Sequence, residues 1–308
     1  MLKSVFFGNS EFCLPSLEVL KLKTDLSLIC TGPDKKVGRG MQSLKIPEPK
    51  EFALKNNIEF LQTYDFNEIF SVLKKLQPDI IIVISYGKII PNYVFNLPKI
   101  GTFNIHASLL PKYRGASPIQ EAIINQDKET GITIQRINER LDEGNIVYTK
   151  KIDISDDDNY ITLREKLSFL AADSLKEFID ILSKGILKEE RQYGPSSYCR
   201  KIKKEDGKID WKNDKTNDII NKWRAFILWP NIFTYYKGKK IIIRKLSRFN
   251  YDLPLELPGR IHIIDRKLIV ETVDGLLFFE NLKPENSREM SYLDFINGYK
   301  IKTGEVFE

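Results

Sequence analysis

The sequence predicts an α/β protein in which a doubly wound, mostly parallel sheet is followed by a small antiparallel β-barrel. Residues 1–155 alternate short apolar runs with longer helical stretches, the rhythm of a parallel sheet covered by helices. The run DIIIVIS at 79–85 is apolar almost throughout, as expected of a central strand buried on both faces. Beyond residue 208, short β-rich segments broken by turns replace this alternation.

The expected elements of the first region follow from these runs in order. The strands are SVFFG (4–8), DLSLICT (25–31), DIIIVIS (79–85), GTFNI (101–105) and GITIQRI (131–137). The helices are FCLPSLEVLK (12–21), EFALKNN (51–57), FNEIFSVLKKL (66–76), SPIQEAIINQ (117–126) and 160–184. The last helix has leucines at helical spacing, Asn159 as its cap and Gly185 at its end.

Three regions are expected along the chain. Residues 1–185 form the first domain, and the polar stretch 186–208, which carries Gly-Pro-Ser-Ser, is a linker. Residues 209–308 form the barrel, whose expected strands are NIFTYYKG (231–238), KKIIIRKL (239–246), GRIHIID (259–265), KLIVETVDG (267–275) and LLFFENL (276–282).

Composition excludes several classes of protein. No apolar run approaches the roughly 20 residues that cross a bilayer, and no secretory signal opens the chain. Three separated cysteines and two histidines cannot assemble a zinc site. We therefore expect a cytoplasmic, metal-free protein, and a monomer.

Asn104 and His106 mark a candidate site. Positions i and i+2 of a strand face the same way, and ligands of open parallel sheets bind beyond the carboxyl ends of the strands. An imidazole exchanges protons near neutral pH, and an amide donates to a developing oxyanion, so the pair suits acyl transfer. LDEGN (141–145) supplies Asp142, at a turn between strands, as an orienting group. Spacing alone leaves open a purely structural His106.

The segment after this strand predicts a loop and a helix start. Ser117 reads as a cap, with Pro118 in the first turn and Gln120 three residues after the cap. Residues 112–115 are then expected to be a tight exposed loop, in which Arg114 either meets an anion or braces the loop.

NIHASLLPKYRGASPIQ (104–120) resembles the signature of formyltransferases that use 10-formyltetrahydrofolate, and its ending resembles the methionyl-tRNA formyltransferase branch of that family. Further stretches fit in order: PDKKVGRG (33–40), SYGKIIP (85–91), ETGITI (129–134), LDEGN (141–145), KIDW (208–211) and RAFILWP (224–230). The resemblance spans nearly the whole chain. It implies a Rossmann-like formyltransferase domain followed by an OB-like barrel.

The resemblance also implies functional residues. The catalytic three are Asn104, His106 and Asp142, and the substrates are 10-formyltetrahydrofolate and initiator methionyl-tRNA, whose amine attacks the formyl carbon. The folate pocket, lined largely by backbone, comprises Tyr86, Gly87, Ile89, Ile90, Ser108, Leu109, Leu110 and Pro111.

The loop 31–50 is too rich in glycine and proline to predict a strand or helix. Its GRG (38–40) lacks the third glycine of a dinucleotide fingerprint, which disfavours an oxidoreductase. By resemblance the loop contacts the tRNA acceptor stem through Arg39, with Lys36 and Lys45. Family members often continue with adjacent lysines where this chain has Met41-Gln42-Ser43. In LDEGN, this chain has Glu143 and Asn145 where the family commonly has Thr and Asp.

Net charge concentrates at the C-terminal end. Residues 201–308 carry 21 Lys and Arg against 16 Asp and Glu, whereas the whole chain has a net charge of +6. KGKKIIIRKLSR (237–248) predicts a cationic strand that contacts phosphates through Lys239, Lys240 and Arg244, or else a solvated edge strand. The tryptophans could stack on bases, but we interpret them as packing residues of the domain: Trp211, Trp223 and Trp229.

Two rival functions use the same residues. The first is formyl transfer to an amino-sugar nucleotide or to glycinamide ribonucleotide, which requires neither the GRG loop nor a basic C-terminal module. The second is a tRNA-binding protein without chemistry, in which Asn104, His106 and Asp142 are structural.

Overall fold

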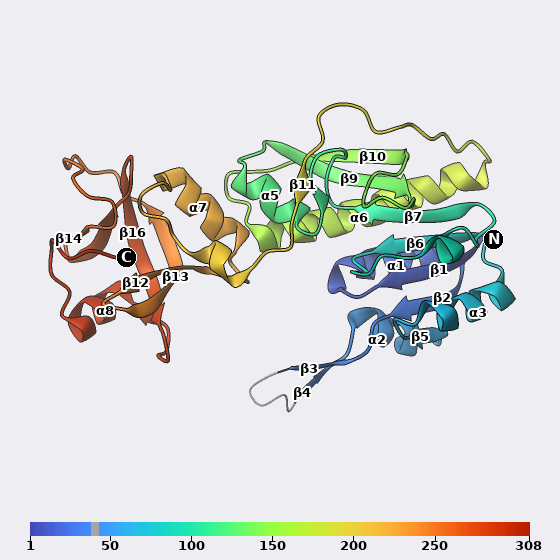
Figure 1. Ribbon diagram of the computed structural model, residues 1–308, viewed down its shortest axis with the longest axis horizontal. Helices are drawn as coiled ribbons and strands as arrows, with labels where there is room; N and C mark the ends of the chain where they lie inside the picture. Colours follow the sequence, from blue (N-terminus) through green and yellow to red (C-terminus); the bar gives the residue numbers. More distant parts are fainter. Residues whose placement is uncertain (38–42) are drawn as a thin grey trace. The chain divides into compact units, whose positions relative to one another are not determined.

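The computed structural model describes residues 1–37 and 43–308 (Figure 1). In the N-terminal part the elements are β1 (Lys3–Gly8), η1 (Glu11–Cys13), α1 (Leu14–Lys23), β2 (Asp25–Thr31), β3 (Lys35–Val37), β4 (Ser43–Lys45), α2 (Glu48–Lys55), β5 (Phe60–Gln62), α3 (Phe66–Leu76), β6 (Ile80–Ile84), α4 (Asn92–Phe95), β7 (Gly101–His106), β8 (Arg114–Gly115), α5 (Pro118–Ile124), β9 (Glu129–Arg136), β10 (Ile146–Asp153), α6 (Tyr160–Ser183) and β11 (Tyr198–Cys199). The C-terminal part contains η3 (Lys204–Gly207), α7 (Thr216–Ala225), β12 (Ile232–Tyr236), β13 (Lys239–Arg248), β14 (Ile261–Ile264), β15 (Lys267–Glu271), β16 (Leu276–Pro284), β17 (Met290–Ser291) and α8 (Tyr292–Tyr299).

The chain divides into two compact units. The first comprises Met1–Pro118, Lys128–Ser155 and Thr162–Arg200, and the second comprises Ile119–Asp127, Asp156–Ile161 and Lys201–Glu308. Across both described ranges, no helix is long and apolar enough to cross a membrane.

A seven-stranded sheet organises the first unit, with the order β10-β9-β7-β6-β1-β2-β5. The pairs β5-β2, β2-β1, β1-β6 and β6-β7 are parallel, whereas β9 pairs antiparallel with both β7 and β10. The mostly parallel α/β prediction is therefore confirmed. β6, the DIIIVIS run, lies between β1 and β7 in mid-sheet, as Figure 1 shows.

Helices cover both faces of this sheet. On one face, α3 and α4 pack on β1, β2 and β6, where Leu73 and Val94 join a cluster with Val5 and Val83. On the other, Phe178 of α6 packs on Phe103 of β7 with ring centroids 4.8 Å apart. Successive side chains of β7 point to opposite faces of the sheet, so Asn104 lies on the face opposite Phe103.

Two local predictions have clear outcomes. The start of α6 is as expected, since the Asn159 side chain accepts a hydrogen bond from the Ile161 N–H at 2.8 Å. The prediction that 31–50 holds neither strand nor helix is wrong. Lys35–Val37 and Ser43–Lys45 pair as the antiparallel strands β3 and β4, and α2 already begins at Glu48. Three-residue strands that pair only with each other leave no periodic signal in the sequence.

An antiparallel sheet in the order β12-β13-β16-β15-β14 forms the second unit, which confirms the predicted class. The C-terminal segment bridges its two outer strands. Glu308 exchanges backbone hydrogen bonds with Tyr235 of β12, and the Ile261 N–H of β14 donates to the Glu305 carbonyl at 2.7 Å. These bonds close the sheet into a barrel.

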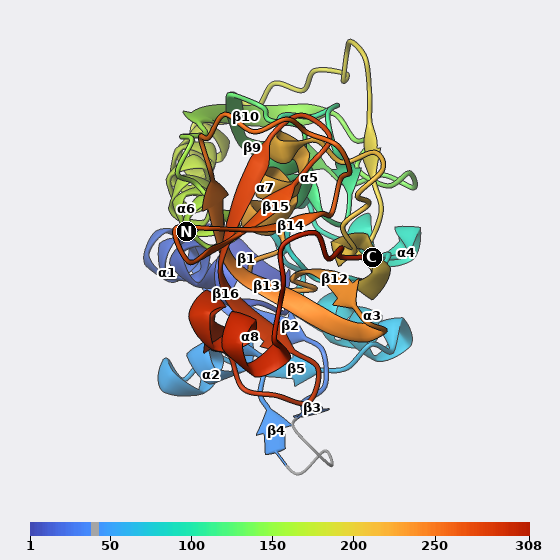
Figure 2. The same cartoon turned by 90° about the vertical axis from the view of Figure 1, so that its left-hand side faces the viewer.

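The barrel is filled by aromatic side chains. The Trp211 ring stacks on Phe307 at 6.3 Å, and its indole N–H donates to the Thr234 hydroxyl at 2.8 Å, so Trp211 is a packing residue. Sequence patterns missed α7 and α8. In Figure 2, α8 lies beside β16, where Tyr292 contacts Phe278 with ring centroids 4.9 Å apart.

Candidate active site

The structure brings Asn104, His106 and Asp142 together at the end of β7. The amide Nδ2 of Asn104 lies 3.3 Å from Oδ1 of Asp142, and Nδ1 of His106 lies 3.7 Å from Oδ2 of the same carboxylate. His106 is 6% exposed. A half-buried amide, a buried imidazole and a carboxylate therefore share one edge of the sheet.

Asp142 occupies the turn between the antiparallel strands β9 and β10, as the sequence predicts. Its φ of +54° lies in the left-handed region, which costs an L-residue about 1–2 kcal/mol. Besides Asn104, two further donors hold the carboxylate. Gln135 Nε2 donates to Oδ1 at 2.8 Å and the Gly115 N–H donates to Oδ2 at 2.9 Å. Three hydrogen-bond donors therefore fix this carboxylate.

The hydrogen bond of His106 to a carbonyl assigns its tautomer. Nε2 lies 2.8 Å from the Tyr113 carbonyl oxygen, which can only accept, so Nε2 carries a proton. Nδ1 of the neutral ring then bears a lone pair beside the Asp142 carboxylate. The 3.7 Å separation is too long for a hydrogen bond, so the carboxylate faces the imidazole without bonding to it.

The prediction of an exposed loop at 112–115 is wrong at its centre. Tyr113 is 7% exposed and Arg114 is 9% exposed. β8 pairs in parallel with β11, so a segment more than 80 residues downstream covers it, and this coverage is not visible in local sequence. Tyr113, like Asp142, has a left-handed φ (+59°), and strained residues of this kind cluster at functional sites.

Arg114 braces the loop. Its guanidinium donates to Gln192 Oε1 from Nε at 3.0 Å and from Nη2 at 2.7 Å, and to the Tyr198 hydroxyl at 2.9 Å. It also lies 3.3 Å from Glu143. The Tyr198 hydroxyl hydrogen bond, aided by Arg114 and Arg140, keeps the pKa of Glu143 below its usual value.

The predicted folate residues divide by exposure. Tyr86 and Ile90 are buried in the core, so they can offer only backbone to a ligand, and burial raises the pKa of Tyr86. Gly87 (φ +75°) is exposed, and the Ile89 side chain is 80% exposed. Asn92 Nδ2, 3.5 Å from Glu139 Oε1, links this segment to the loop that precedes Asp142.

The second group of predicted folate residues forms a compact turn after β7. The Ser108 hydroxyl donates to the Lys112 carbonyl at 2.6 Å, and the Leu110 N–H donates to the Thr133 hydroxyl at 3.1 Å. Leu110 and Pro111 are joined by a cis peptide bond, and Leu109 is half-buried.

The predicted tRNA contacts of the loop are only partly described. Arg39 lies outside the described residues. Lys36 lies in β3, and its side chain is likewise outside the description. Lys45 ends β4 with its side chain 61% exposed and pairs with Glu48 at 3.1 Å.

On β13, the predicted tRNA contacts have different surroundings. Lys239 is exposed, and the ammonium of Lys240 lies 3.3 Å from the centroid of the Phe233 ring. Burial, with neighbouring Lys204, lowers the pKa of Lys240. Arg244 pairs with Glu289 at 3.2 Å.

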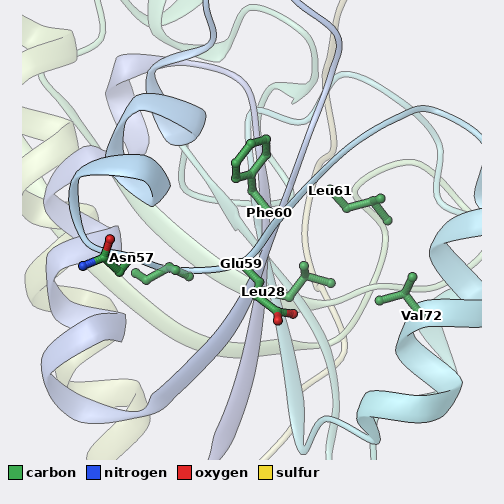
Figure 3. Close-up of a pocket in the computed structure, with 7 residues that line it drawn as sticks. Leu28, Asn57, Glu59, Phe60, Leu61 and Val72 are labelled. Carbon is green, nitrogen blue, oxygen red and sulfur yellow. The ribbon is translucent and has the colours of Figure 1, made fainter.

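A pocket of about 420 Å³ lies elsewhere, around the edge strand β5, and β6, β1 and β2 separate it from β7 (Figure 3). Its lining consists of Leu28, Asn57, Ile58, Glu59, Phe60, Leu61 and Val72. It contains none of the predicted site residues. Among the residues described, no group of His, Cys, Asp or Glu is arranged to hold a metal ion.

Sequence reasoning missed two amides at the site, Gln135 and Gln192. Gln135 is 2% exposed in an otherwise apolar strand, and a polar residue within GITIQRI was the available signal. Gln192 Nε2 donates to the Asp142 carbonyl at 2.8 Å from a segment expected to be a linker. No local pattern identifies such a contact.

Comparisons with known proteins identify the family of this chain. Residues 2–179 match the family described as formyl transferase, and residues 201–300 match the formyl transferase C-terminal domain. A methionyl-tRNA formyltransferase of Thermodesulfovibrio yellowstonii is 41% identical over 303 residues, covering 97% of each chain. One from Caldicellulosiruptor saccharolyticus is 40% identical, covering 98% of each.

Solved structures share the fold at lower identity. An N-formyltransferase from Helicobacter canadensis, in complex with folinic acid and dTDP-3-aminofucose, is 20% identical with a TM-score of 0.68, covering 94% of this chain and all of that one. HypX from Aquifex aeolicus, in complex with tetrahydrofolic acid, is 14% identical with a TM-score of 0.64, covering 99% of this chain and 48% of that one. The two matched domains and the full-length relatives place this chain in the formyl transferase family, among the methionyl-tRNA formyltransferases.

Proposed function

We propose that this chain transfers the formyl group of 10-formyltetrahydrofolate to the α-amine of initiator methionyl-tRNA. The observation that carries the proposal is the convergence of Asn104, His106 and Asp142 at the end of β7, in a chain that is 41% identical to a methionyl-tRNA formyltransferase. These three residues supply an oxyanion donor, a base and a charge that stabilises the protonated base.

The mechanism assigns one role to each residue. The formyl carbon comes from the folate co-substrate, and the methionyl nitrogen forms a new bond to it. Asn104 donates an amide N–H to the oxygen that becomes negative, and Nδ1 of His106 takes the proton that the amine loses. Asp142 stabilises the resulting imidazolium. His106 then returns the proton to the folate nitrogen as its bond to the formyl carbon breaks.

The residues present fit a folate. Ile89 and Leu141 offer exposed apolar side chains (80% and 59% exposed) on the segments beside the site. Gly87 exposes its backbone, since an added Cβ would meet nothing within 4 Å. A flat pterin ring can cover such apolar side chains while it bonds to backbone groups. We propose the 86–90 and 108–111 segments as its binding site.

The tRNA is proposed to engage two regions. Arg39, Lys36 and Lys45 on the 31–50 loop are assigned to the acceptor stem, and Lys239, Lys240 and Arg244 are assigned to phosphates. Phosphate contacts position the substrate without reading sequence. Since initiator methionyl-tRNA is used in translation, we place the reaction in the cytoplasm. We propose a monomer, which predicts a sedimentation mass of 35.8 kDa.

A direct transfer assay tests the function. Labelled 10-formyltetrahydrofolate is supplied with initiator methionyl-tRNA and an amino-sugar nucleotide as competing acceptors. The expected result is label on the tRNA amine. Label on the sugar would overturn the assigned acceptor, and label on neither would favour a tRNA-binding role without chemistry.

A further inference from the structure

Gln192 contacts the backbone of the turn that carries Asp142. Its Nε2 lies 2.8 Å from the Asp142 carbonyl oxygen, 2.9 Å from the Gly144 carbonyl oxygen and 3.2 Å from Gln135 Oε1. One amide therefore bonds to the backbone of the turn at two places. It also contacts the side chain of Gln135, which itself donates to the Asp142 carboxylate.

Gln192 is fixed in turn by Arg114. The two guanidinium bonds to Oε1 leave Nε2 as the only end of this side chain amide that can face the turn. Arg114 and Tyr198 both contact Glu143, the residue after Asp142. The contacts run from Asp142 through Gln192 and Arg114 back to Glu143, so they form a closed ring around the turn.

We propose that Gln192 is a positioning residue for the transfer, acting through Asp142. The proposal rests on the function proposed above. Asp142 holds a left-handed φ of +54°, and a strained residue keeps its geometry only when its surroundings fix it. The Gln192 side chain contacts the turn and its supports Gln135 and Arg114, and its amide donates to the Asp142 backbone. Loss of this donor releases the turn, and the carboxylate leaves His106.

Two substitutions separate donation to the turn from simple pairing with Arg114. Gln192→Leu removes both functions. Gln192→Glu keeps an oxygen for Arg114 but places a second oxygen against the Asp142 and Gly144 carbonyls. We expect both variants to lower kcat by about 10–100-fold, as loss of supporting hydrogen bonds does, with KM for both substrates nearly unchanged. Wild-type kcat in Gln192→Glu would overturn the proposal, because pairing with Arg114 would then suffice.

The control is the neighbouring Tyr193→Ala, since the Tyr193 side chain is 95% exposed. It should leave kcat and the melting temperature unchanged. Hydrogen exchange of peptides that span 138–146 supplies a readout independent of activity. These peptides should exchange faster in Gln192→Leu than in Tyr193→Ala, and equal exchange would overturn the proposal.

A double-mutant cycle tests whether the effect passes through Asp142. Gln192→Leu should reduce kcat in the wild-type background and change it little in an Asp142→Asn background. An equal reduction in both backgrounds would overturn the positioning role. If Asp142→Asn alone retains wild-type kcat, the catalytic assignment fails instead. If the wild type transfers no formyl group, the proposed function fails, and the exchange experiment still decides whether Gln192 holds the turn.

Discussion

Nδ1 of His106 faces Oδ2 of Asp142 across 3.7 Å, while the opposite ring nitrogen lies 2.8 Å from a backbone carbonyl. The carbonyl fixes the position and tautomer of the ring, and the carboxylate supplies charge without a direct hydrogen bond. Nδ1 is therefore left with a lone pair on the side of Asp142 and Asn104. This arrangement predicts which changes abolish transfer and which only loosen the fold.

Asn104→Ala tests the oxyanion role. Removal of one oxyanion donor typically lowers kcat by about 10²–10³-fold, and we expect that loss with little change in either KM. Single-turnover transfer of labelled formyl measures the chemical step. Asn92→Ala is the control, since Asn92 also bears an amide near the site, 3.5 Å from Glu139, and has no proposed contact with the oxyanion. A comparable loss in both variants would contradict the assignment.

The two histidines should behave in opposite ways. His106→Ala removes the base, so activity per folded molecule should be lost with only a small drop in the melting temperature. His262→Ala removes the partner of Glu271, a fully buried carboxylate 2.5 Å away, which costs about 2–3 kcal/mol of stability. Activity per folded molecule should persist in that variant. Calorimetry and transfer assays on both proteins check this, and a His106→Ala protein that retains its activity would make His106 structural.

Gly144→Ala should damage the turn through sterics. A Cβ built on Gly144 lies 1.6 Å from the Arg136 carbonyl oxygen, so the β9-β10 connection must shift. Overpacking of this kind costs about 1–3 kcal/mol, and kcat should fall as Asp142 moves. Gly298→Ala is the matched control, because its Cβ meets nothing within 4 Å and lies in α8, where alanine is favoured over glycine. Unchanged kcat in Gly144→Ala would show that the turn tolerates displacement.

Binding of tRNA should weaken steeply as salt rises, because phosphate contacts release counterions. Lys239→Gln should reduce the magnitude of the slope of log affinity against log salt by about one. Arg244→Gln should reduce it less, since Glu289 already pairs with Arg244 at 3.2 Å. Filter binding between low and physiological salt measures both slopes. If the tRNA affinity of the wild type did not change with salt concentration, the basic strand β13 would have no part in tRNA binding.

Features whose side chains follow a regular pattern over a few neighbouring residues could be predicted from the sequence. DIIIVIS identified the central strand by its continuous apolar run, and the i, i+2 spacing placed Asn104 and His106 on one face. The turn of Asp142 was predicted between strands at LDEGN, although the strand after it, β10, was not itself identified. Each inference used neighbours within a few residues, which is the range over which side-chain periodicity carries information.

Features made by distant segments could not be predicted. Burial of Arg114 depends on Gln192 and Tyr198, which lie 78 and 84 residues away, and neither sits in a periodic pattern. The short helix α8 did have a local signal that was overlooked. Ser291 and Asp294 form a capping box at its start, and this spacing is visible in the sequence.

The closing segment of the barrel should make stability depend on acid pH through Glu305. The Lys237 ammonium, the Lys302 N–H and the Tyr236 hydroxyl all donate to this carboxylate and lower its pKa to about 2. A depressed folded-state pKa stabilises the fold above the unfolded value, near 4.3, and this contribution is lost as the pH falls towards 2. Glu305→Gln should therefore destabilise the protein by ~1 kcal/mol at pH 7, allowing for partial exposure, and the difference should vanish near pH 2. Denaturant unfolding followed by intrinsic tryptophan fluorescence, with exposed Asp252→Asn as the control, measures this difference at each pH. A Glu305→Gln deficit that stays constant between pH 7 and pH 2 would mean that the charge of Glu305 does not hold the C-terminal segment against β12 and β14.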